Sequence, residues 1–176
     1  MDDAELVRLA QAGERDAFDA IVQRHQRRIY QLCYGFVGNH EDASDLAQDV
    51  FVRAFRALPK FKGDSALATW LHRIAVNVCL NRKAVKVPRF APIEQVEPVD
   101  VRTERADAAV LRNERAIQVR EAVARLPPKQ RATLILRAYH ELPHEEIAKI
   151  LGSSVGAVKA NFCHALANLK RLMESS

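Results

Sequence analysis

The sequence predicts an all-α protein of two small helical domains joined by a flexible linker, and three observations lead to this prediction. Apolar residues recur three and four positions apart along most of the chain, without the sustained alternation that is typical of strands. Prolines and mixed polar residues interrupt this pattern around 91–108. Beyond the interruption, two short apolar-periodic segments flank Gly152, which indicates a helix-turn-helix in the second domain.

The N-terminal domain is expected to span 1–90. A short helix should end near Gly13, and a longer one should close at Gly38, since glycine accepts the left-handed turn after a helix. A third helix follows from Glu41, with Pro59 as its stop. Its apolar stripe is Ala43, Leu46, Ala47, Val50, Phe51, Ala54, Phe55 and Leu58. After the loop KFKGDSAL, a fourth helix should turn Trp70, Leu71, Ile74, Ala75, Val78 and Cys79 inward.

The C-terminal domain is expected to span 109–176. One helix should end at Leu126, and another should cover 129–139 after the Pro127-Pro128 pair. In HEEIAKILGSSVGAVKANF, Ala148 is small enough to let the second helix of the hairpin cross closely, and Ser153 or Ser154 can cap that helix. We predict its buried stripe to be Val155, Val158, Phe162, Leu166, Leu169 and Leu172.

Charge is distributed unevenly around a net value of +5. From Arg53 to Arg89 there are nine Lys or Arg side chains against the single acid Asp64, whereas 92–107 holds five acids against two arginines. Two basic blocks joined by an acidic bridge favour two modules that both approach a polyanion, although one basic block alone could be a solvated face. No apolar run is long enough for a membrane span, and the acidic N-terminus is no signal peptide, so a cytoplasmic protein is expected.

The sequence gives little indication of a binding site for a small molecule or a metal. Cys33, Cys79 and Cys163 are widely spaced, form no C-x-x-C pair and are expected to be buried free thiols. Cys163-His164 alone cannot make a metal site. There is no phosphate-binding glycine loop, so no cofactor and no small-molecule substrate are expected.

The last predicted helix presents a face suited to a DNA major groove. Its residues are small or polar: Gly156, Ala157, Lys159, Ala160, Asn161, Cys163 and His164. Small residues let a recognition helix sit deep in the groove, and a Ser154 cap leaves the first amides near phosphate. The alternative is a packed helical hairpin with a solvated polar face. The spacing and the basic context favour DNA binding.

HEDASDLAQDVFVRAF places Asp42, Asp45 and Asp49 on one predicted helix, with Gln48 beside the last two. Paired carboxylates could serve a metal or catalysis, but no His or Glu partner stands at ligand spacing. An exposed acidic face is usually solvated, and a third possibility is a docking surface for a basic partner.

The segment FKGDSALATWLHRIAVNVCLNRK contains a polar loop, and the helix after it carries a row of polar side chains four residues apart. The row consists of Arg73, Asn77 and Asn81. Asn side chains offer both a donor and an acceptor, and aromatic rings can stack on unpaired bases, so this region suits single-stranded DNA. Trp70 itself is expected to be a core residue, and a solvated row is the alternative. The candidate DNA contacts are Lys62, Gly63, Asp64, Ser65, Thr69, Arg73, Asn77 and Asn81.

Taken in order, three motifs resemble the extracytoplasmic-function (group IV) sigma factors of bacterial RNA polymerase. They are DASDLAQDVFVRAF, FKGDSALATWLHRIAVNVCLN and LPPKQRATLILRAYHELPHEEIAKILGSSVGAVK, and they cover nearly the whole chain. The resemblance implies a non-enzymatic transcription initiation factor of the stress-response type. Its first domain would bind core polymerase and melt the promoter −10 element, and its second would read the −35 element. An anti-sigma factor is an implied partner, and it could hold this otherwise cytoplasmic protein at the inner membrane.

Carried over by position, the resemblance assigns roles to residues of this chain. Asp45, Gln48 and Asp49 would dock on the coiled coil of the largest polymerase subunit, and the loop 62–69 with Asn77 and Asn81 would capture a flipped base of the −10 element. The −35 contacts would be Lys129, Arg131, Ser154, Lys159, Ala160, Asn161, Cys163 and His164. Similar proteins often carry arginines where this chain has Asn161 and His164, so the −35 bases that it reads are expected to differ.

Two other functions would fit parts of the sequence. A dimeric helix-turn-helix repressor would bind a duplex operator tightly without polymerase. An enzyme acting on nucleic acid through Asp42, Asp45 and Asp49 would need a metal for turnover.

Overall fold

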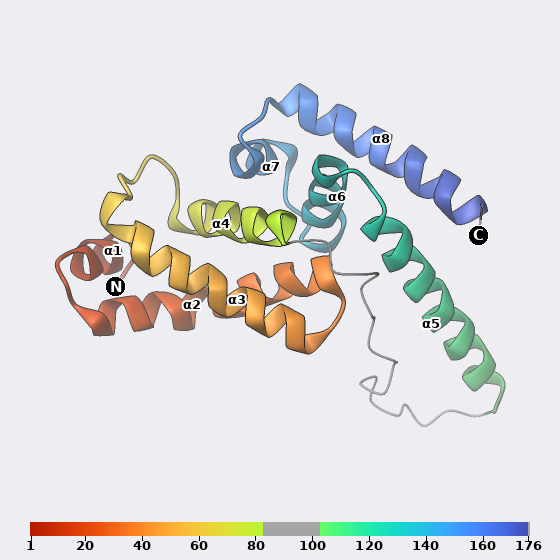
Figure 1. The fold of residues 1–176 in the computed structure, drawn as a ribbon, viewed down its shortest axis with the longest axis horizontal. Coiled ribbons are helices and arrows are strands. Elements are labelled where there is room, and N and C mark those ends of the chain that lie inside the picture. Colours follow the sequence, from red (N-terminus) through yellow and green to blue (C-terminus); the bar gives the residue numbers. More distant parts are fainter. Residues whose placement is uncertain (83–102, 176) are drawn as a thin grey trace.

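The structure is a computed structural model that describes residues 1–82 and 103–175, with side chains up to 82 and from 108 onward. Within these ranges every regular element is a helix and no strand is present, which confirms the all-α prediction (Figure 1). The elements form two groups, here called the N-terminal unit (residues 1–82) and the C-terminal unit (residues 103–175). No helix of the described part is long and apolar enough to span a bilayer.

The N-terminal unit follows the helix signals of its sequence. Its elements are α1 (Asp3–Gln11), α2 (Arg15–Val37), α3 (His40–Ala57), the 3-10 turn η1 (Leu58–Lys60) and α4 (Leu67–Asn81). Gly38 ends α2 with a left-handed φ of 74°. Asn39 then caps α3, because its side-chain oxygen accepts a hydrogen bond of 2.9 Å from the Asp42 amide. Pro59 lies in the 3-10 turn and stops the regular helix there.

The long helices of this unit pack around one apolar core. Ile21, Ile29 and Leu32 of α2 are almost fully buried, as are Val50 of α3 and Leu71 of α4. Val50 and Leu71 lie on the predicted inward faces of their helices, and burial of the apolar stripes holds the three helices together.

The C-terminal unit ends in a helix-turn-helix. Its elements are α5 (Thr103–Ala124), α6 (Pro128–Leu134), the π turn η2 (Ile135–Tyr139), α7 (His144–Leu151) and α8 (Val155–Glu174). Helix α5 begins within the predicted linker 91–108, and the linker residues before 103 lie outside the described residues. The domain boundaries set by that linker remain a prediction.

The turn between α7 and α8 has the geometry that its sequence predicts. Gly152 adopts a left-handed φ of 64°, and the Ser154 hydroxyl caps α8 by accepting a 3.1 Å hydrogen bond from the Ala157 amide. Ala148 is buried where the two helices meet, beside Ile147 and Val158, which have no exposed surface. The hairpin is therefore a packed unit that holds the outer face of α8 in a fixed orientation.

Two burial predictions for α8 are wrong. Leu166 is 45% exposed, and Ala165 is buried in its place. Successive residues of a helix are rotated by about 100° around its axis. Two steps of four from Val158 therefore place Leu166 off the inner face, whereas a step of three after Phe162 places Ala165 on it. Cys163 lies on the same outer side and is exposed, not buried, while Cys33 and Cys79 are buried free thiols as predicted.

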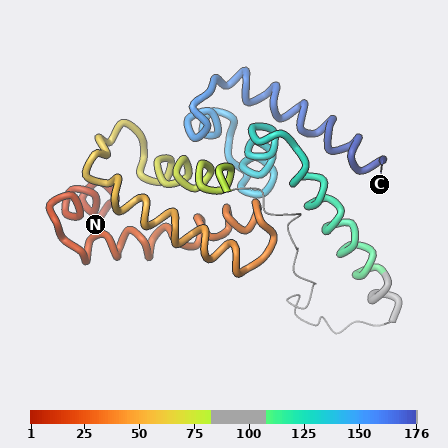
Figure 2. Tube along the Cα trace, in the orientation of Figure 1, coloured from red at the N-terminus to blue at the C-terminus, as the bar shows by residue number. Residues whose placement is uncertain are grey.

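The two units lie against each other. Helix α4 contacts α7, and α2 contacts the π turn η2. Figure 2 shows the trace of α4 running beside the C-terminal unit, where it contacts α7. Residues more than 70 positions apart in the sequence are thereby brought together, for example Thr69 and Glu146.

Candidate nucleic-acid interface

The outer face of α8 is open to solvent. Lys159, Ala160, Cys163 and His164 are all exposed there, and Asn161 is half-buried. Ser154 is exposed at the N-terminus of the helix, where its hydroxyl caps the first turn. The face thus combines one cation with small or polar side chains on a rigid helix, a shape and chemistry that suit entry into a major groove.

The two basic residues predicted to support α8 differ in their surroundings. Lys129 is exposed at the start of α6. Arg131, two residues later, is directed into the N-terminal unit, where its guanidinium donates a hydrogen bond to the Phe36 carbonyl and lies 5.2 Å from the centre of the Phe36 ring. Burial lowers the pKa of Arg131. In this arrangement Arg131 does not share a face with the other predicted −35 contacts.

The polar loop before α4 is exposed and held by a ring pair. Lys62, Gly63 and Asp64 are exposed, and Gly63 has a left-handed φ of 77° that glycine adopts without strain. The rings of Phe61 and Trp70 flank the loop with their centres 4.8 Å apart. Trp70 is half-buried and packs against the core, as expected, so it fixes the base of the loop.

The predicted row on α4 is only partly accessible. Asn77 and Asn81 are exposed toward the end of the helix. Thr69, at its start, is 3% exposed, and its hydroxyl donates a 2.5 Å hydrogen bond to a carboxylate oxygen of Glu146 on α7. The Arg73 Nε donates to the Lys149 carbonyl at 2.7 Å. Helix α7 therefore engages Thr69 and Arg73, although the Arg73 side chain remains exposed.

The acidic face of α3 shows no sign of a metal centre. Asp45 and Gln48 are exposed, and Asp49 pairs with Arg53 at 3.2 Å. Asp42 is engaged elsewhere: hydrogen bonds from the Asn39 side chain and from Arg82 hold the pKa of its carboxyl below the usual range. Among the described residues, no group of three His, Cys, Asp or Glu side chains could hold a metal ion.

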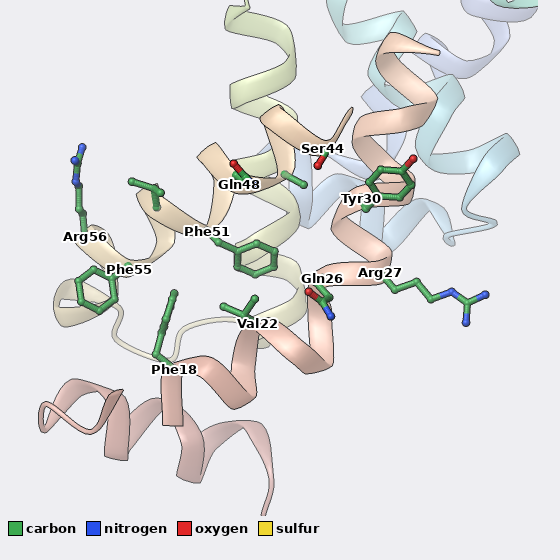
Figure 3. A pocket seen from close by; sticks show the side chains of 12 residues that line it. Phe18, Val22, Gln26, Arg27, Tyr30, Ser44, Gln48, Phe51, Phe55 and Arg56 are labelled. Atoms are coloured by element: carbon green, nitrogen blue, oxygen red, sulfur yellow. The ribbon is translucent and has the colours of Figure 1, made fainter. Parts of the chain in front are cut away.

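An apolar groove beside this acidic face was missed by the sequence reasoning. The groove lies between α2 and α3, encloses about 1000 Å³ and includes Gln48 on its rim (Figure 3). Phe18 and Phe55 pack edge to face at one end with ring centres 5.1 Å apart, and Phe55 is 55% exposed. The sequence held a signal for the groove, because the apolar stripe of α3 is too wide for one buried face and continues past it into Val52.

Comparison with known families and proteins matches both units. The family described as Sigma-70 region 2 matches residues 21–86, and the family described as Sigma-70, region 4 matches residues 116–169. The chain is 38% identical to the ECF RNA polymerase sigma factor SigM of Mycobacterium tuberculosis, over 97% of this chain and 84% of that protein. It is 35% identical to the RNA polymerase sigma-H factor of Pseudomonas aeruginosa, over 93% of this chain and 89% of that protein.

Solved structures with similar folds were also found. CnrH, solved in complex with the cytosolic domain of CnrY, has a TM-score of 0.67 and 28% identity, covering 99% of this chain and 98% of that one. The sigma factor RpoE of Bartonella quintana, solved with the anti-sigma factor NepR, has a TM-score of 0.57 over 89% of this chain and 96% of that one. At 18% identity the second likeness concerns the fold alone.

Proposed function

This chain belongs to the extracytoplasmic-function family of RNA polymerase sigma factors, and we propose that it directs core polymerase to promoters through a −10 reader on α4 and a −35 reader on α8. The observation that carries the proposal is the likeness to SigM over nearly the whole chain, with a separate family match on each unit. The protein would supply recognition and melting, would act in the cytoplasm where polymerase and DNA meet, and would leave the chemistry of RNA synthesis to the core enzyme.

For the −35 element, the proposed reader is the exposed face of α8. Lys159 would contact phosphate, and Asn161 and His164 would approach base edges. An arginine can pair bidentately with guanine, whereas Asn suits adenine. The absence of arginine from these positions therefore favours a −35 element read less through guanine than is typical of the family.

For the −10 element, the proposed reader is the loop 62–65 together with Asn77 and Asn81. An exposed loop and exposed amide side chains further along α4 can accept bases that have left the stack, and the captured bases offset the cost of opening the duplex. Thr69 and Arg73 would complete this surface if their hydrogen bonds to Glu146 and to the Lys149 carbonyl were exchanged for contacts with DNA.

Core polymerase would dock on α3 through Asp45, Gln48 and Asp49. Two of these side chains are exposed, and Asp49 is held only by a surface ion pair with Arg53, which is easily exchanged for a basic partner. The groove beside them offers Val52 and Phe55 to the same partner. Charge would guide the encounter, and apolar contact would supply much of the affinity.

We also propose that an anti-sigma factor controls the protein. The similar structure of CnrH was solved with the cytosolic domain of CnrY, and RpoE of Bartonella quintana was solved with an anti-sigma factor. In this chain the groove between α2 and α3 would accept the apolar face of a partner helix. An anti-sigma factor with a membrane anchor would hold the protein at the inner membrane.

Run-off transcription with core polymerase on genomic DNA tests the proposed function. The protein should produce transcripts from a limited set of start sites that share two upstream elements, and the Gln48→Ala variant should need more protein for the same yield. A gel shift on those promoters without core enzyme distinguishes this function from that of a repressor, which would bind the duplex tightly by itself. Transcripts that are unchanged by the protein would contradict the proposal.

A further inference from the structure

The side chain of Gln11, the last residue of α1, reaches the segment that leads into the loop 62–65. Its amide nitrogen Nε2 donates hydrogen bonds to the Phe61 carbonyl at 2.8 Å and to the Leu58 carbonyl at 3.0 Å. The NH2 group of an amide carries two protons, so one side chain can serve both acceptors. Figure 1 shows α1 at the same end of the N-terminal unit as this segment. Gln11 therefore ties the first helix of the chain to the residue that precedes the loop.

The two carbonyls lie where α3 ends and need donors from elsewhere. A helix leaves its last carbonyls without a partner inside the helix, and Pro59 in the 3-10 turn has no amide proton to offer. The Leu58 carbonyl also accepts a 3.0 Å hydrogen bond from the Phe61 amide. Within the described part of the chain, the Phe61 carbonyl has Gln11 as its only donor. Removal of the Gln11 amide would therefore remove the hydrogen bond that holds the Phe61 carbonyl.

Helix α1 is itself held firmly, so its last residue acts from a fixed position. Leu6 is buried in the core of the N-terminal unit. At the other end of the helix, the Asp3 carboxylate accepts a 2.8 Å hydrogen bond from Arg24 and lies 3.2 Å from the His25 Nε2, both on α2. Because packing and ion pairing fix α1 on α2, a hydrogen bond from Gln11 restrains its partner rather than moving with it.

The loop has few restraints of its own. Within the residues that the structure describes, the side chains of Lys62 and Asp64 have no hydrogen-bond or ion-pair partner, and the Ser65 hydroxyl donates only to the carbonyl of the next residue, at 3.3 Å. A segment with so few contacts opens and moves easily, so its shape depends on how its two ends are held. The downstream end is fixed by α4, where Trp70 packs against the core. The upstream end is Phe61, which α1 holds.

We propose that Gln11 is a positioning residue of the −10 reader: by holding the Phe61 and Leu58 carbonyls, it keeps the loop 62–65 in the shape that accepts an unstacked base. The inference rests on the proposed function, which gives the loop that role. It adds a residue that contacts no DNA and that lies before the segment 21–86 matched by the Sigma-70 region 2 family. A loop held in its binding shape before the base arrives loses less entropy on capture, so capture becomes tighter.

Three substitutions at Gln11 separate hydrogen bonding from size and charge. Gln11→Met keeps the length of the side chain but removes the donor, and Gln11→Glu keeps the shape but at neutral pH can only accept. Gln11→Lys restores a donor for the two carbonyls. All three new residues favour helices, so α1 should persist, and circular dichroism with thermal unfolding checks this. Gln23→Met is the matched control, because Gln23 is exposed on α2 and, among the described residues, has no side-chain hydrogen-bond partner.

The first measurement uses the one tryptophan of the chain to report on the base of the loop in the absence of DNA. The ring centre of Trp70 lies 4.8 Å from that of Phe61, so a looser Phe61 exposes the indole. Quenching of the tryptophan fluorescence by acrylamide should increase in Gln11→Met and Gln11→Glu. Gln11→Lys and the control should be quenched like the parent protein, because both keep a donor at the two carbonyls.

The second measurement follows base capture. Holoenzyme is assembled from core polymerase and the full chain, and its affinity for a fluorescein-labelled single-stranded oligonucleotide is measured by anisotropy. The oligonucleotide is the non-template strand upstream of a start site mapped by run-off transcription. Gln11→Met should bind it about threefold to tenfold more weakly, as expected when the stabilisation from one hydrogen bond is lost, while the control binds like the parent. Affinity for core polymerase should not change in either variant.

The outcomes separate this inference from the proposed function. Unchanged quenching in Gln11→Met, or unchanged oligonucleotide binding while the parent holoenzyme binds, would overturn the positioning role and leave the proposed function intact. An equal loss of core and oligonucleotide affinity would also overturn it, because Gln11 would then support only the stability of the unit. A parent holoenzyme that starts no transcript would contradict the proposed function, and the quenching would still decide whether Gln11 holds the loop.

Discussion

The two DNA-reading surfaces proposed for this chain differ in how much of each the chain itself covers. On α8, Lys159, Ala160 and His164 are exposed. On α4, Thr69 is buried and bonded to Glu146 of α7, whereas Asn77 is exposed further along the same helix. The proposed −35 surface is therefore accessible on its helix, whereas the proposed −10 surface is interrupted at Thr69 by a contact with the other unit.

The largest expected effect comes from breaking the core of the helix-turn-helix. Ile147 is fully buried, so Ile147→Ala should lower the free energy of unfolding of the C-terminal unit by about 2–5 kcal/mol. Duplex binding by α8 should be lost, because this core holds the outer face of α8 in place. Thermal unfolding followed by circular dichroism, together with a duplex-binding assay, checks this.

Leu166→Ala is the control for that experiment. Leu166 lies on the exposed side of α8, so its removal should change stability by no more than about 0.5 kcal/mol and leave duplex binding as it was. Equal losses of stability in the two variants would contradict the burial pattern of the helix-turn-helix.

The next effect separates the exposed part of the α4 row from the exposed face of α8. Asn77→Ala removes a donor and an acceptor from the −10 surface, and each hydrogen bond to a captured base is worth about 0.5–1.5 kcal/mol. We expect promoter opening, measured by permanganate reactivity of the melted strand with core polymerase, to fall several-fold. Duplex −35 binding should not change, and an equal loss of both would contradict the division of roles.

Most of the helices could be predicted from the sequence, because their ends are set locally. Gly38, Pro59 and Gly152 mark turns whose backbone needs only neighbouring residues, and the apolar period of each helix identifies its inner face. The exposed face of α8 could be predicted for the same reason. Of the two wrong burial predictions for this helix, the one for Leu166 reflects a step of four where the helix face requires three.

The contact between the units could not be predicted in this way. Thr69 and Glu146 are 77 residues apart, and no local pattern marks either as a partner of the other. The sequence predicts that Arg131 contacts DNA, because a basic residue near a helix-turn-helix usually does. In the structure its guanidinium instead binds the Phe36 carbonyl. Interfaces between units depend on shape as well as residue type, and an apolar period carries no information about shape.

A smaller effect tests the α8 surface alone. Lys159→Ala should weaken duplex promoter binding modestly at low salt and reduce the slope of log affinity against log salt by about 1, because one phosphate contact is lost. Lys170→Ala is the matched control, since Lys170 is exposed near the other end of the same helix. Equal salt slopes for the two variants would show that Lys159 makes no phosphate contact of its own.

The smallest expected effect is a dependence of the stability of the folded protein on pH. Burial lowers the pKa of His72 most strongly, the Ala68 carbonyl and Glu146 oppose that shift, and Arg28 and His25 add to it. Burial likewise lowers the pKa of His140, which also faces His72 and Arg28. At a pH above the ordinary histidine value both rings are neutral in the folded and in the unfolded chain, so the stability linked to them is fully present.

As the pH falls through that ordinary value, the unfolded chain binds protons first, and the folded protein loses stability until the lowered pKa values are reached. The midpoint of thermal unfolding, followed by circular dichroism, should therefore fall as the pH drops from about 7, before the carboxylates titrate. The double variant His72→Gln, His140→Gln should flatten this dependence, with His164→Gln on the exposed face of α8 as the control. A fall of the same size in the double variant would show that other groups take up the protons.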